Sequence, residues 1–124
     1  MKERETIIKN YFESWIRKDN NKLKYIFTDE IIYIESHGPV YKGINDVEKW
    51  FKEWNKIGIV LKWDIKQFVH QKNITVVEWF FKCSYNKVIS SFDGVSIIKF
   101  DKYDLINYLK EFQSKNQHYF PYEY

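Results

Sequence analysis

The fold is decided by residues 74–100, which read ITVVEWFFKCSYNKVISSFDGVSIIKF. β-Branched and aromatic residues dominate this stretch, and Asn86 and Lys87 form a short polar break near its middle. Such residues favour strands, and two polar residues between two apolar runs are typical of a hairpin turn. The stretch therefore predicts two long antiparallel strands, 74–85 and 88–100.

Two more strands are predicted on either side of this hairpin, over residues 59–70 and 105–113. Short polar turns, 71–73 and 101–104, connect them to the hairpin. Four strands with such close connections indicate a meandering antiparallel sheet. We expect the sheet to curl, because long antiparallel strands are twisted.

The N-terminal half predicts three helices and one strand. Apolar residues recur every three to four positions over 5–17 and, briefly, over 22–27, which is the spacing of a helix. Residues 31–35 are β-branched and aromatic, as in a strand. A third helix is expected to begin at position 45 or 46 and to end near Gly58.

This order of elements predicts an α+β fold in a single domain, residues 1–124. We expect three N-terminal helices packed in the concave face of a curled, mainly antiparallel sheet, a cone-shaped α+β barrel. The core covers about residues 5–113, and an aromatic tail follows over 114–124. Such a sheet, closed by helices, leaves a conical cavity of the kind that holds a small ligand.

Composition and charge exclude several classes of protein. The chain has 124 residues, a net charge of +3 and one cysteine, so neither an intrachain disulfide nor a cysteine zinc site is possible. Lysines alternate with acidic residues, no nucleic-acid motif is present, and no run approaches the roughly 18 apolar residues of a membrane span. The charged N-terminus does not read as a secretory signal. We expect a cytoplasmic protein that uses no metal or cofactor and binds neither nucleic acid nor a membrane.

Three segments resemble the nuclear transport factor 2-like superfamily and, within it, a SnoaL-like domain. They are residues 11–29, with YFESW and LKYIFTD; residues 38–50, with GPVYKGI and a following Trp; and residues 77–101, with VEWFF and FDGVSIIKFD. Their order and spacing indicate the fold rather than one activity. The superfamily includes isomerases, dehydratases, epoxide hydrolases, polyketide cyclases and proteins that only bind or scaffold.

The resemblance to ketosteroid isomerase, a member of this superfamily, implies a catalytic set. Tyr11 matches the helix-1 tyrosine that helps to hold an oxyanion, and Glu35 stands at the position of the aspartate base. Ser96 stands where the relative has a second acid, so a weaker hydrogen-bond donor remains there. The resemblance also implies a homodimer that forms through the outer face of the sheet.

Glu35 is the sharpest candidate for chemistry. It shares one side of its predicted strand with Tyr33, and a carboxylate among aromatic rings has the raised pKa that suits a general base. The alternative is an ion pair with a Lys or Arg. His37 either faces the same cavity as a second base or belongs to a turn. Tyr11 either points its hydroxyl into the cavity or is an ordinary core residue.

The expected walls of the pocket are aromatic or small. The resemblance and the period-two alternation of a strand agree on Trp79, Phe81 and Cys83, opposite Phe92 and Ser96. Tryptophans of this kind more often fill a core, and the tail rings could cover the cavity mouth or pack on a second copy. The full set of expected pocket residues is Trp15, Tyr33, Trp50, Trp79, Phe81, Cys83 and Phe92.

Three functions fit these features. The first is a cofactor-free isomerase, dehydratase or cyclase that uses a carboxylate base on a small apolar or aromatic substrate. The second is a non-catalytic protein that binds a hydrophobic ligand in the same pocket. The third is a dimeric interaction module whose interior is filled by its own rings.

Overall fold

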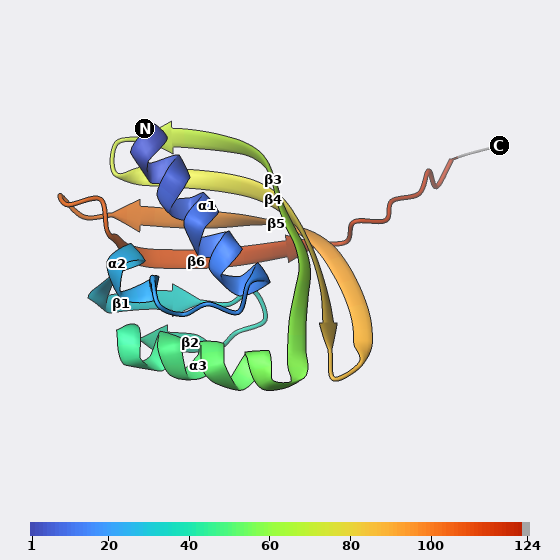
Figure 1. Cartoon of the computed structure of the whole chain (residues 1–124). Helices are drawn as coiled ribbons and strands as arrows, with labels where there is room; N and C mark the ends of the chain where they lie inside the picture. The colour runs from blue at the N-terminus through green and yellow to red at the C-terminus, as the bar shows by residue number, and fades with distance from the viewer. Residues whose placement is uncertain (123–124) are drawn as a thin grey trace.

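The computed structural model describes residues 1–122 and has the predicted α+β class, with helices against one six-stranded sheet (Figure 1). The helices are α1 (Lys2–Ile16), α2 (Leu23–Ile26) and α3 (Ile44–Ile57). The strands are β1 (Phe27–Ile34), β2 (Val40–Lys42), β3 (Gly58–Gln71), β4 (Ile74–Tyr85), β5 (Val88–Phe100) and β6 (Ile106–Ser114). The aromatic tail leads away from β6, and its last two positions, 123–124, lie outside the described residues.

The sheet is mixed and open, with strand order β2-β1-β6-β5-β4-β3. Strands β3 to β6 form the predicted antiparallel meander, whereas β1 pairs with β6 in parallel. Strand pairing does not close the sheet into a barrel, because β2 and β3 are edge strands at opposite ends of the sheet. Helix α3 packs against both of these edge strands and so lies between the two ends of the sheet. Figure 1 shows β3, β4 and β5 bending around the helices.

The first two strands differ from the prediction. Strand β1 begins at Phe27, inside the segment expected to end a helix, so α2 is a single turn. Strand β2 lies between the first predicted strand and the third predicted helix, where no element was predicted, and its pairing with β1 sets Tyr41 opposite Tyr33. Both features depend on pairing between strands, which local sequence pattern does not encode.

Helix α1 is fixed to the sheet by its apolar face. Ile8, Tyr11, Phe12 and Trp15 are all buried, and the ring of Phe12 stacks on Trp63 of β3 at 3.8 Å between centroids. This packing decides which way Tyr11 and Trp15 point. None of the helices in residues 1–122 is long and apolar enough to cross a membrane.

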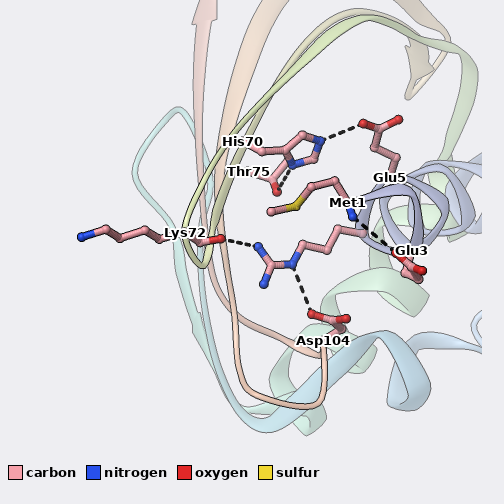
Figure 2. A network of polar contacts seen from close by, with 8 residues as sticks. Met1, Glu3, Glu5, His70, Lys72, Thr75 and Asp104 are labelled. Carbon is pink, nitrogen blue, oxygen red and sulfur yellow. Dashed lines mark hydrogen bonds and ion pairs between the residues drawn. The ribbon is translucent and has the colours of Figure 1, made fainter.

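A polar network holds the first turns of α1 to two loops of the sheet (Figure 2). Arg4 Nε donates to Asp104 at 3.1 Å, and Arg4 Nη1 donates to the backbone carbonyl of Lys72 at 2.6 Å. His70 lies 2.7 Å from a carboxylate oxygen of Glu5. These contacts join α1 to the β3–β4 and β5–β6 connections, so the helix cannot slide along the sheet.

Glycine is required where the chain passes from β2 into α3. Gly43 has a φ of +85°, a value that side chains with a Cβ rarely adopt. A Cβ there would also lie 3.2 Å from the backbone oxygen of Asp29. The turn at Gly43 directs α3 back across the sheet and brings Trp50 and Trp54 toward α1.

Candidate functional site

A cavity of about 480 Å³ lies between α1, α3 and the inner face of the sheet. Its volume is typical of small-molecule sites, which measure roughly 300–1,000 Å³. All five tryptophans of the chain line it, together with three glutamates. The lining residues are Trp15, Glu35, Ser36, His37, Tyr41, Trp50, Glu53, Trp54, Trp63, Trp79, Phe81, Cys83, Tyr85, Phe92, Glu111 and Gln113.

Glu111 of β6 is the acid at the centre of a buried relay. Tyr33 Oη donates to Glu111 Oε2 at 2.5 Å, and Tyr11 Oη donates to Tyr33 Oη at 2.6 Å. Burial and, to a smaller extent, the charge of Glu35 raise the pKa of Glu111, and together they outweigh the lowering effect of the hydrogen bond from Tyr33 and bring the pKa to about 8. Glu111 is therefore largely protonated at neutral pH and able to donate a proton or a hydrogen bond.

The two tyrosines of the relay stay neutral. Burial and the nearby charge of Glu111 hold the pKa of both Tyr11 and Tyr33 well above the ordinary value. Their side chains are at most 1% exposed, and neither lines the cavity. The two tyrosines are connected to the cavity only through the hydrogen bond to Glu111, so they can hold this carboxyl group in place but do not contact a ligand.

Glu35 lies directly after the last residue of β1 and has a different environment. Tyr41 Oη donates to Glu35 Oε1 at 2.5 Å, and His37 Nδ1 lies 3.9 Å from Glu35 Oε2. Burial raises the pKa of Glu35, whereas the hydrogen bond from Tyr41 and the proximity of His37 lower it. No Lys or Arg in residues 1–122 forms an ion pair with Glu35, which was the alternative at the sequence level.

The expected wall residues Trp15, Trp50, Trp79, Phe81, Cys83 and Phe92 all line this cavity. His37 lies at its mouth with a side chain 63% exposed. Ser96 is fully buried, accepts a hydrogen bond from Trp79 Nε1 at 3.0 Å, and does not reach the cavity. The structure thus brings Glu35 and His37 together and places Tyr11, Tyr33 and Ser96 behind the wall.

Among the lining residues that were not expected, Glu111 and Tyr41 take part in the hydrogen bonds of the site. Glu111 lies directly opposite Ser96 in the β5–β6 register. The neighbouring strand therefore places a carboxyl group beside the position of Ser96. A signal was present in the sequence, since period-two alternation from the buried Leu109 puts Glu111 on the inner face. Tyr41 lies in a segment for which no helix or strand was predicted, and it gave no comparable signal.

No group of three or more His, Cys, Asp or Glu in residues 1–122 is arranged so that it could hold a metal ion. Cys83 is a buried free thiol that lies 3.6 Å from the hydroxyl of Ser90. The polar chemistry of the cavity is therefore that of its carboxyl and phenol groups.

A family model described as a SnoaL-like domain matches residues 8–108. The matched range includes Glu35 and ends three residues before Glu111. The chain belongs to the SnoaL-like domain family. No curated protein matches the sequence of this SnoaL-like protein.

Several solved structures share the fold of this SnoaL-like protein. An LEH-like epoxide hydrolase from M. tuberculosis has a TM-score of 0.81 at 9% identity, covering 91% of this chain and 84% of that one. A hypothetical protein with a ketosteroid isomerase-like fold from Catenulispora acidiphila, in complex with trimethylamine, has a TM-score of 0.77 at 12% identity, covering 87% and 85%. A SnoaL-like polyketide cyclase, so described, from Shewanella denitrificans has a TM-score of 0.76 at 12% identity, covering 90% of each chain. At these identities the likeness shows the fold alone.

Proposed function

We propose that this SnoaL-like protein is a cofactor-free enzyme that carries out general acid–base chemistry on a small organic molecule. The reaction class is isomerisation, dehydration or cyclisation. The observation that carries the proposal is the presence of two carboxyl groups, Glu35 and Glu111, in different environments of one aromatic cavity. A pair of titratable groups whose surroundings separate their pKa values is the arrangement from which acid and base roles arise.

The surroundings of the two groups assign their roles. Burial raises the pKa of Glu35, as suits a general base, while the hydrogen bond from Tyr41 and the neighbouring His37 offset part of that shift and favour the ionised form, so we assign Glu35 as the base. Glu111 is protonated at neutral pH and acts as the acid or holds a developing oxyanion. Tyr33 and Tyr11 are positioning residues that act through Glu111, and His37 assists at the mouth.

The relatives support this reaction class. An epoxide hydrolase and a protein described as a polyketide cyclase share the fold, and both names describe reactions of organic molecules. The trimethylamine complex of the Catenulispora protein supports the use of such a cavity for a small ligand. That complex equally supports the second candidate, a protein that binds a ligand without transforming it. The open cavity counts against an interaction module filled by its own rings.

The ring opening of nitrobenzisoxazole tests the base. In this reaction a base removes the ring C–H proton while the N–O bond breaks, and the electrons end on a coloured phenolate. We expect turnover by the wild type that increases with pH, and a loss of at least about a hundredfold in kcat/KM for Glu35→Gln. Glu30→Gln, which changes an exposed carboxylate outside the cavity, is the matched control. Full turnover by Glu35→Gln would contradict the proposal.

We further propose a homodimer through the outer face of the sheet. Apolar residues cross this face in register, with Val76 opposite Ile97 and Val95 opposite Phe112, which is 44% exposed. Glu78 and Lys110 lie in the same rows, so this face is apolar and charged in turn, and such a face on an uncovered sheet suits a second copy of the chain.

Light scattering should give a mass twice the 15.3 kDa of one chain, and Phe112→Lys should shift the equilibrium toward the single chain. Tyr103→Lys, at a position that is 73% exposed and outside these rows, should leave the mass unchanged. A mass of one chain for the wild type at every concentration would exclude the dimer.

A further inference from the structure

We infer that the ligand of this cavity is a small organic cation with an apolar shell, of the alkylammonium class. The inference rests on the proposed function for the use of the cavity as a small-molecule site, and it names the class of molecule. Three independent features of the lining carry it: the sign of its charges, the nature of its walls and the packing of those walls.

The ionisable side chains of the lining are mainly acidic. Glu35 and Glu53 are carboxylates, and Glu111 is a carboxyl group that keeps its proton at neutral pH. None of the Lys or Arg side chains in residues 1–122 lines the cavity, and His37 at the mouth is the basic group of the lining. The chain has 20 Lys and Arg and a net charge of +3, so this exclusion runs against its composition. An anionic ligand would find no Lys or Arg here, whereas a cation would meet the carboxylates of Glu35 and Glu53 and the carboxyl oxygens of Glu111.

The walls are built from the rings that attract cations best. Every Trp of the chain faces this cavity, and Tyr41, Tyr85, Phe81 and Phe92 complete the surface. The face of an aromatic ring carries partial negative charge, and Trp gives the strongest attraction. Recognition of quaternary ammonium groups by a box of aromatic rings uses this attraction.

The rings stand at steep angles to one another, as the walls of a box do. Trp15 is inclined to Trp50 by 58° at 4.8 Å and to Trp54 by 86° at 5.4 Å. Trp50 stacks on Tyr41 at 4.5 Å, and the phenol of Tyr41 holds Glu35. A carboxylate and an aromatic face are thus fixed side by side, so a cation that contacts one also lies near the other.

A neutral apolar ligand fits these features less well. A neutral ligand would displace water from the carboxylates without giving them a hydrogen-bond donor or a positive charge. Removing an unpaired charge from water costs free energy, so such binding would be weakened. A cation with methyl groups fills the aromatic walls and also neutralises the carboxylates. Charge, rather than size or apolar area, is therefore the property that should decide affinity.

Choline and its neutral isostere dimethylbutanol, in which a carbon atom replaces the quaternary nitrogen, separate these two cases. Both are titrated into the wild-type protein at fixed ionic strength and followed by tryptophan fluorescence and calorimetry. We expect saturable binding of choline that is at least about tenfold tighter than that of the isostere. Equal affinities, tighter binding of the isostere, or no saturable signal from choline would overturn the inference.

Variants of Trp50 test the aromatic wall. Trp50→Leu should bring the two affinities together within about threefold, whereas Trp50→Phe should retain most of the preference for choline. Tyr25→Leu, at a ring 69% exposed outside the cavity, should change neither affinity. If Trp50→Leu folds, as judged by circular dichroism, and keeps the full preference, the aromatic wall does not recognise the charge.

The two proposals fail in different ways. Nitrobenzisoxazole is neutral, so its turnover depends on the base and not on recognition of a cation. If turnover depends on Glu35 but choline and its isostere bind equally well, the acid–base function stands and the inference of a cationic ligand is wrong. If choline binds preferentially but no turnover is seen, the inference of a cationic ligand stands, and the protein binds its ligand without transforming it.

Discussion

Replacing Glu111 by Gln should stabilise the protein by on the order of 3 kcal/mol near pH 9 and by almost nothing near pH 4. Glu111 has a pKa of about 8 in the folded chain against an ordinary value of 4.5. Between these two values the folded chain keeps a proton that the unfolded chain releases. The stability linked to that proton is fully present below about pH 4.5 and is lost as the pH rises through 8. Gln has no proton to lose, so the advantage of the variant grows with pH.

Urea denaturation at several pH values from 4 to 9 measures this difference directly. Gln preserves the size of the side chain and an oxygen that can accept the hydrogen bond from Tyr33, so packing changes little. Glu30→Gln removes an exposed carboxylate and serves as the matched control, with a free energy of unfolding close to that of the wild type at each pH. A constant difference between Glu111→Gln and wild type across the range would show that Glu111 is ionised in the fold throughout.

The local sequence pattern was sufficient to predict the strands of the antiparallel meander. Strands β4 and β5 begin and end at the predicted residues, 74–85 and 88–100, because polar turn residues bound them on both sides. Strand β1 was placed too late, since its first residues gain their partner from distant Ile106 of β6. Strand β2 has three residues and no pattern of its own, and it forms because β1 offers an edge.

The site was predictable where alternation along one strand decided it. Trp79, Phe81 and Cys83 follow each other at every second position of β4, and all three line the cavity. Glu111 required the register between β5 and β6, which sets it opposite Ser96. That register passes through a shift near Phe100 and a left-handed residue, Asp104, with a φ of 59°. Neither feature is readable from one sequence, so alternation along β6 could place Glu111 on the inner face but could not place it opposite Ser96.

Gly94→Ala should destabilise the protein by about 3 kcal/mol and reshape the cavity. Gly94 of β5 lies opposite Trp79 of β4, and the indole ring covers the position that a side chain would take. A Cβ on Gly94 would lie 2.2 Å from Cη2 of Trp79 and 2.6 Å from the backbone oxygen of Phe112. Trp79 is 2% exposed and donates to Ser96, so the ring has neither space nor freedom to move aside.

A smaller ring should relieve this clash, which makes the mechanism testable by a double-mutant cycle. Trp79→Phe alone is expected to cost stability through lost packing, but Gly94→Ala should cost at least about 1 kcal/mol less in that background than in the wild type. Urea denaturation of the four proteins measures the coupling. Independent, additive costs would mean that Gly94 matters for the strand backbone and not for the indole. A positive coupling would show that the absence of a side chain in β5 allows Trp79 to lie flat against the sheet, which is how one wall of the cavity is built.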